Sequence, residues 1–185
     1  MNDTYLSKGT TIELERIAGE FSAGVGPEAS LDQIKVCLES KGFSADHLVY
    51  DDGSLLLLCG PPESNAHSLR DGLDRKSVRY ITPVYRHNGS KLLLTDTLKV
   101  EFSRDLTDTE LERFCEKYGI VHMGKLPLNY RLFRVDNADG RGPLMVSDLI
   151  ETQRGLARHS MPVFLEFNTE PAVPIEDIVD DVPNP

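Results

Sequence analysis

Residues 79–89 read RYITPVYRHNG, and a similar stretch, RHSMPVFLEFN, follows at residues 158–168. Pro83 and Pro162 hold the same place in the two stretches and are separated by 162 − 83 = 79 residues. Self-similarity at a fixed period indicates a repeated structural unit. We therefore interpret the two stretches as the closing strands of two copies of one module.

Two predicted helices carry matching start and stop signals. Residues 30–33 (SLDQ) and 107–110 (TDTE) both have the form of a capping box, in which the first side chain accepts from the fourth backbone N–H and the fourth side chain reaches back. Gly42 and Gly119 each lie twelve positions after the cap (42 − 30 and 119 − 107), where glycine can take the left-handed conformation that ends a helix. Two unrelated helices would seldom share cap, length and stop signal, so the helices also indicate a repeat.

A strand precedes each of these helices and a hairpin follows it. The segments IELERIAGEF and LKVEF end at Phe21 and Phe102, and the second alternates apolar and charged residues as a half-buried strand does. Turn residues at 51–53 and 127–129 divide the two hairpins, and a second, weaker helix pattern follows each hairpin.

Each copy thus reads β-α-β-β-α-β, the order of a ferredoxin-like module with an antiparallel four-stranded sheet and two helices on one face. The sequence predicts an α+β fold with two such modules in tandem, at residues 8–87 and 88–168. Residues 169–185, with acidic side chains and several prolines, are predicted to be an extended C-terminal tail.

Two predicted strands, YRLFRV (130–135) and PVFLEF (162–167), carry apolar side chains on both faces. A strand with one solvated face should instead alternate. Such strands need cover on the sheet face away from the helices. Either the first module or a homodimer partner packs there, or the face docks on a partner protein, because large exposed apolar patches usually mark an interface.

Charge and composition limit the classes of function. The net charge is −10, and an acidic chain repels phosphate backbones, so we expect no nucleic-acid partner. No apolar run approaches the roughly 20 residues of a membrane span, and the N-terminal segment lacks a signal peptide. We therefore expect a cytoplasmic protein without a membrane partner.

Three widely spaced cysteines fit reduced thiols, and Cys37 and Cys115 are predicted to be core residues.

No set of residues for catalysis or cofactor binding is apparent. The five histidines and three cysteines do not pair at metal-ligand spacing, and the glycines form no phosphate-binding motif. Asp51 and Asp52, beside Gly53, are interpreted as hairpin-turn residues rather than as paired catalytic carboxylates. We expect no catalytic residue, no metal and no cofactor in this chain.

Four segments carry a family resemblance: VRYITPVYRHNGSKLLLTDTLKVEFSRDLTDTELERFCEKYGI from residue 78, LPLNYRLFRV, PVFLEFNTEP and the final VPNP. Together they resemble the N-terminal prodomain region of bacterial subtilisin-like serine proteases. In that family a strand ends in P-V-Y/F, another runs from L-T-D/N-x-L to V-x-F, and a V-P-N-D/P segment leads into the catalytic domain. Residues 1–77 match only in general layout.

The resemblance implies a prodomain that acts as an intramolecular chaperone and as an inhibitor of the catalytic domain, in cis or in trans. The sheet would dock on two surface helices of that domain, and the chain that leaves the last strand would lie in the substrate cleft. The docking face would comprise Tyr130, Leu132, Val163 and Leu165, or the opposite set. The cleft segment would comprise Phe167, Asn168, Thr169 and Glu170, with residues 169–185 as the linker towards the catalytic domain.

The triad motifs of the family, Asp-Ser/Thr-Gly, His-Gly-Thr and Gly-Thr-Ser, are absent from the chain. The chain by itself is therefore not expected to be the protease. The alternative hypothesis is a stand-alone tandem ferredoxin-like scaffold or a small-ligand regulatory module, because this fold order serves many functions.

Overall fold

The computed structural model describes residues 2–50, 53–71, 73–74, 76–136, 142–153 and 155–167. The expected turn residues Asp51 and Asp52 and the acidic tail lie outside these ranges.

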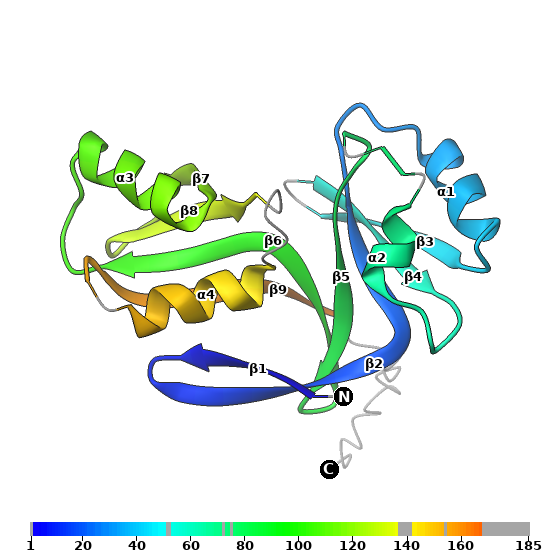
Figure 1. Cartoon of the computed structure of the whole chain (residues 1–185), viewed down its shortest axis with the longest axis horizontal. Coiled ribbons are helices and arrows are strands. Elements are labelled where there is room, and N and C mark those ends of the chain that lie inside the picture. The colour runs from blue at the N-terminus through cyan, green and yellow to red at the C-terminus, as the bar shows by residue number, and fades with distance from the viewer. Residues whose placement is uncertain are drawn as a thin grey trace, which may run out of the picture.

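The chain opens with a hairpin of β1 (Asn2–Ser7) and β2 (Thr10–Val25). Two series of elements follow β2 (Figure 1). The first comprises α1 (Leu31–Glu39), β3 (Ser44–Tyr50), β4 (Gly53–Cys59), α2 (Ala66–Arg70) and β5 (Val78–His87). The second comprises β6 (Ser90–Phe102), α3 (Asp108–Tyr118), β7 (Ile120–Lys125), β8 (Tyr130–Val135), α4 (Pro143–Thr152) and β9 (Ala157–Phe167).

The fold is α+β, and the described strands pair antiparallel throughout. The first half (β2 to β5) has the strand order β3-β4-β2-β5, and the second half (β6 to β9) has the order β7-β8-β6-β9. The two orders are the same once corresponding strands are matched. Figure 1 shows the halves as two lobes, with α1 and α2 on one and α3 and α4 on the other.

Three features of the sheet were not predicted. The strands of both halves form one nine-stranded sheet rather than two separate ones, because β5 and β6 are joined in a hairpin. Asn88 (φ 50°) and Gly89 (φ 86°) take the left-handed conformations that such a tight turn requires. The strand β1 lies outside the predicted first module, and β2 continues four residues past Phe21, to Val25.

The start and stop signals of the helices are confirmed in three of four cases. Thr107 accepts from the N–H of Glu110, whose side chain accepts from the N–H of Thr107, so this capping box forms. Gly119 (φ 63°) and Gly42 (φ 83°) are left-handed as expected. The capping box at Ser30 is wrong: this residue has ψ 105°, against 160° at Thr107, and its side chain makes no cap hydrogen bond.

Each half has a core on the helix side of its part of the sheet. In the second half the rings of Phe102, Phe114 and Phe133 meet edge to face or tilted, with centroids 5.0 to 6.1 Å apart. Cys115 is half-buried and packs against the edge of this core. Cys37 is only half-buried, because Ile34 and Leu38 hold the inward side of α1. The first core also contains Phe21, Ala23, Val25, Phe43, Leu56, Leu58, Leu69, Val78 and Ile81.

A third apolar region, the seam, lies between the halves and is built on both faces of the central strands. On one face Leu165 of β9 packs against a cluster that contains Leu55, Leu57, Val84 and Leu93. On the other face the ring of Phe164 lies 5.7 Å from that of Tyr5 and 6.4 Å from that of Tyr85, measured between centroids. The two-sided apolar pattern of PVFLEF is thus explained by the first half and the N-terminal hairpin.

Polar groups also join the halves at the seam. The side-chain oxygens of Ser22 and Thr82 lie 2.8 Å apart, and both hydroxyls donate to the carbonyl of Leu94, at 3.0 and 2.6 Å. Leu94 is the residue after the last one of β6 that pairs with β5. Its carbonyl therefore has no backbone partner in β5, and the two hydroxyls satisfy it instead. This network ties β2 and β5 of the first half to β6 of the second.

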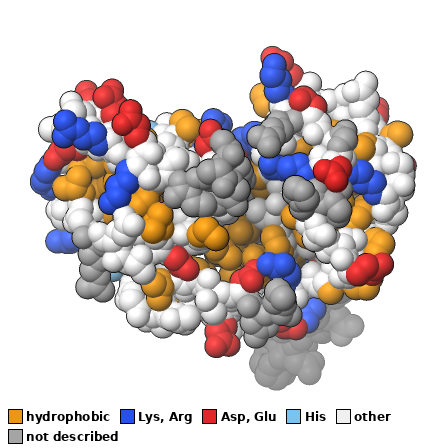
Figure 2. Space-filling model, viewed as in Figure 1, with side chains coloured by type: hydrophobic (Ala, Val, Ile, Leu, Met, Phe, Trp, Pro, Cys, Tyr) orange, Lys and Arg blue, Asp and Glu red, His pale blue; other side chains and the backbone are white. Residues whose placement is uncertain are grey.

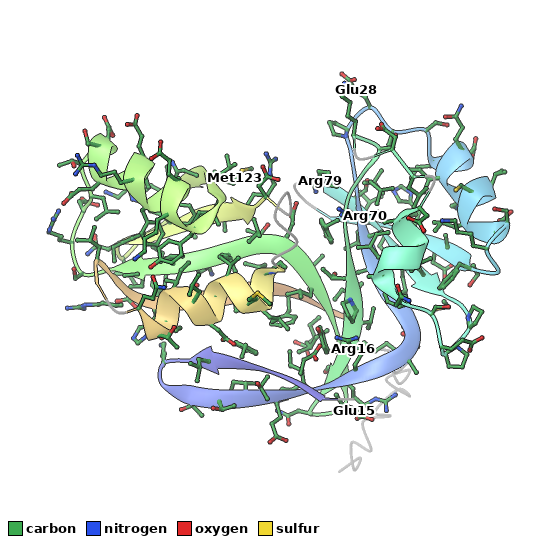
Figure 3. The ribbon with its side chains drawn as sticks, in the orientation of Figure 1. Glu15, Arg16, Glu28, Arg70, Arg79 and Met123 are labelled. Atoms are coloured by element: carbon green, nitrogen blue, oxygen red, sulfur yellow. The ribbon has the colours of Figure 1, made fainter. Side chains whose placement is uncertain are left out.

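The N-terminal hairpin closes the seam from outside. The N–H of Leu6 donates to Oδ1 of Asp148 on α4 at 2.7 Å, so β1 contacts the second half. Arg16 and the hydroxyl of Tyr85 both donate to Oδ2 of Asp3 at 2.7 Å. Figure 3 shows Arg16 where β2 passes the end of β5. The hairpin, the first half and the second half therefore pack as one body.

Candidate docking surface

Among the residues that the structure describes, no helix covers one face of the sheet of the second half, and we call this the bare face. Strand alternation assigns its residues, because Leu98, Val100 and Phe133 point into the core beneath α3 and α4. The residues that alternate with them along each strand point the other way. The bare face consists of Lys99, Glu101, Val121, Met123, Tyr130, Leu132, Arg134 and Met161.

The register of the strands arranges these residues in rows. Lys99 of β6 lies directly opposite Leu132 on one neighbouring strand and opposite Met161 on the other. Glu101 lies opposite Tyr130. Residues opposite each other in adjacent strands have neighbouring Cβ atoms, so each row forms a continuous strip of side chains across the sheet.

Apolar side chains on the bare face are open to solvent at its β7 edge. Val121 is 42% and Met123 is 52% exposed, and Leu128 in the β7–β8 turn is 85% exposed. Figure 3 shows Met123 on the second lobe. The register of β7 shifts between His122 and Gly124, which is the irregularity of a β-bulge and turns the edge strand locally. An edge strand with exposed apolar residues is a surface suited to association.

Charges on the bare face divide it into a paired and an unpaired part. The hydroxyl of Tyr130 donates to Oε2 of Glu101 at 2.8 Å, and this hydrogen bond raises the pKa of Tyr130. Arg158 adds an ion pair to Glu101 at 3.8 Å. Lys99 makes no ion pair within the ranges that the structure describes, whereas the charge of Arg134 acts on the carboxyl group of Asp96. The unpaired charge on this face is therefore positive, although the whole chain is acidic.

The structure places the four predicted docking residues in three different settings. Tyr130 and Leu132 lie on the bare face, as the alternation of YRLFRV indicated. Val163 lies beside the irregular stretch of β6, where its carbonyl accepts from the hydroxyl of Thr95 at 2.9 Å. Leu165 packs in the seam. The predicted set is therefore not brought together on one surface.

The predicted cleft segment is described only at its first residue. Phe167 is the last residue of β9, and its backbone pairs with Lys91 beside the β5–β6 turn. Asn168, Thr169 and Glu170 lie outside the described residues. The chain leaves the sheet at the end of the seam rather than at the β7 edge.

Sequence reasoning missed Val121, Met123 and Met161 as members of this surface. Val121 and Met123 stand two positions apart in a strand, and that period-2 spacing was an available signal. Met161 is placed on this face by its pairing with Lys99, a long-range contact that the sequence alone does not give.

The carboxyl group of Asp96 is buried in the irregular stretch of β6. Asp96 is 5% exposed, and burial raises the pKa of its side chain, against the opposing charges of Arg79 and Arg134. Its side chain accepts from the hydroxyl of Thr97 at 3.4 Å.

Within the described ranges, no group of three His, Cys, Asp or Glu side chains is arranged to hold a metal ion. None of the helices there has the length and apolar character to cross a membrane.

Comparison with known proteins adds no relative to these observations. The chain matches no family model, no curated protein and no solved structure.

Proposed function

We propose that the chain is a prodomain-type binding module that chaperones and inhibits a subtilisin-like catalytic domain, in cis or in trans. The observation that carries the proposal is the bare face of the second half. It is a helix-free sheet surface with exposed apolar residues at its edge and an unpaired cation, Lys99, among its side chains. A partner that covers it would bury apolar area, which is the main favourable contribution to association.

In this proposal the two halves are tandem ferredoxin-like modules. The repeated element order and the matching strand orders support the assignment. Leu93 and Leu165 of the second half occupy the helix-free face of the first half, so in the described part of the chain it is the second half that presents an open face for docking. The docking residues are then Tyr130 and Leu132, together with Val121, Met123 and Met161.

The inhibitory part of the proposal assigns the segment from Phe167 to Glu170 and the acidic tail after it to the substrate cleft. An inhibitor tethered to its target acts at millimolar-scale effective concentration, so even a weakly bound strand blocks substrate. A preformed surface that favours the compact state also helps a protease whose folding is limited by a kinetic barrier. The runner-up, a small-ligand regulatory module, is favoured only by the groove described in the next subsection.

The test is to titrate this chain, residues 1–185, into the subtilisin-like domain that is encoded in the same reading frame or operon. Cleavage of a peptide substrate reports the activity of the domain. We expect competitive inhibition and faster refolding of the domain. The double variant Leu132→Glu/Met161→Glu buries charge at the interface and should weaken inhibition by roughly 30-fold or more. Val36→Glu, at an exposed site on α1, is the matched control and should not change it. Absence of both inhibition and assisted refolding would refute the proposal.

A further inference from the structure

A groove lies between α3 and α4, on the side of the sheet away from the bare face. Its volume is about 390 Å³, within the range of small-molecule sites. Five residues with mainly apolar side chains line it: Phe114, Tyr118, Ile150, Leu156 and Ala157. Its length along α3, from Glu110 to Tyr118, is about 12 Å, since eight residues rise 1.5 Å each. Figure 2 shows Lys and Arg side chains beside hydrophobic ones on this part of the surface.

The polar rim of the groove has a free positive charge. Glu110 lines the groove, but Arg104 holds its carboxylate with two hydrogen bonds, at 2.6 and 3.0 Å. Arg113 and Lys117, one turn apart on the same rim, have no ion pair with the described part of the chain. The ammonium group of Lys117 lies 4.9 Å from the centre of the Tyr118 ring, at the border between rim and floor.

The two halves differ at the corresponding position. In the first half Lys41, one residue before Gly42, donates to the carbonyls of Leu69 (3.1 Å) and Asp71, so its cation ties the end of α1 to the end of α2. In the second half the residue before Gly119 is Tyr118. Its ring lines the groove, and its hydroxyl donates to Oε1 of Gln153 at 3.3 Å. At this position the second half thus exposes the ring of Tyr118 to the groove, whereas the first half has Lys41, whose cation is bound by two carbonyls.

We propose that this groove binds a medium-chain carboxylate, with the hydrocarbon chain on the apolar floor and the carboxylate between Arg113 and Lys117. Charge complementarity selects the anion, because the cations are unpaired and the acid on the rim is already bound. The apolar floor selects the chain, and hydrogen bonds from ionised donors to a carboxylate are stronger than neutral ones. The inference does not rest on the docking function, since the groove and the bare face lie on opposite sides of the sheet.

The test is a titration of the ¹⁵N-labelled full chain with three probes: octanoate, 1-octanol and acetate. We expect saturable shifts of the amides of Arg113, Tyr118, Gln153 and Gly155 with octanoate. Binding of octanol, which lacks the charge, should be at least about fivefold weaker, and acetate, which lacks the chain, should not saturate. Shifts centred away from the groove, or equal affinity for octanoate and octanol, would overturn the proposal.

A matched pair of variants separates the groove from general attraction to the protein. Arg113→Gln/Lys117→Gln changes two exposed side chains, so the fold is retained, and it should reduce the affinity for octanoate to that for octanol. Lys35→Gln removes a cation from α1, the corresponding helix of the first half, and should leave the affinity unchanged. Unchanged octanoate binding by the double variant would also overturn the assignment.

Discussion

The substitution Leu93→Ala tests whether the seam joins the two halves into one folding unit. Leu93 is 1% exposed and belongs to the cluster that includes Leu165 of β9 and Leu55 of the first half. The change removes three buried carbon atoms, worth about 2.4 kcal/mol at roughly 0.8 kcal/mol each. The residual cavity adds to this loss, so we expect the free energy of unfolding to fall by about 3 to 4 kcal/mol.

The assay is urea unfolding followed in parallel by far-ultraviolet circular dichroism and by tyrosine fluorescence. For one cooperative unit the two probes give coincident transitions, and both shift together in the variant. Leu165→Ala, from the same cluster, should couple with Leu93→Ala in a double-mutant cycle by at least about 0.5 kcal/mol. Val36→Ala, at a site that is 66% exposed, is the control and should change stability by less than about 0.5 kcal/mol.

Two results would refute the reasoning about the seam. A loss of less than about 1 kcal/mol for Leu93→Ala would mean that the cluster contributes little. A separate early transition, with one half still folded, would mean that the halves are independent modules.

Two predictions concern the start of the helices. Thr107→Ala removes a formed cap and should cost about 1 kcal/mol of unfolding free energy, whereas Ser30→Ala removes no cap hydrogen bond and should cost much less; equal losses in chemical denaturation would contradict the structure. Hydrogen bonds from Arg104 and the Thr107 backbone lower the pKa of Glu110 to about 2. Because folding lowers this pKa, ionised Glu110 stabilises the fold at pH values above its ordinary pKa of 4.5. This stabilisation is lost as the pH falls from 4.5 through about 2. Arg104→Gln should therefore raise the pKa of Glu110 in a carboxyl NMR titration, and an unchanged value would show that the ion pair is absent in solution.

Local signals in the sequence were sufficient to predict the repeated elements. Caps, terminating glycines and alternation act over a few residues, so Thr107, Gly119 and the alternating strand before Phe102 could be placed without knowledge of the rest of the fold. The alternation of YRLFRV likewise put Tyr130 and Leu132 on one side of their strand and Phe133 on the other.

Long-range packing could not be predicted in this way. The strand β1 is held by Asp148, 142 residues from Leu6, and Leu165 faces β4, more than a hundred residues away in the chain. The irregular register of β6 against β9 also divides the closing strand between the bare face and the seam. A prediction made from one repeat unit alone therefore overestimates the solvent-exposed surface of that unit, because the other unit covers part of it.

The methionines allow the most direct test of the bare face as the docking surface. Met123 and Met161 lie on that face, whereas Met145, 59% exposed, lies on α4 on the opposite side of the sheet. With ¹³C-methyl-labelled methionine in the full chain, addition of the subtilisin-like catalytic domain should shift the Met123 and Met161 signals and leave that of Met145 in place. A shift of Met145 alone, or no shift at stoichiometric addition of the domain, would contradict the account.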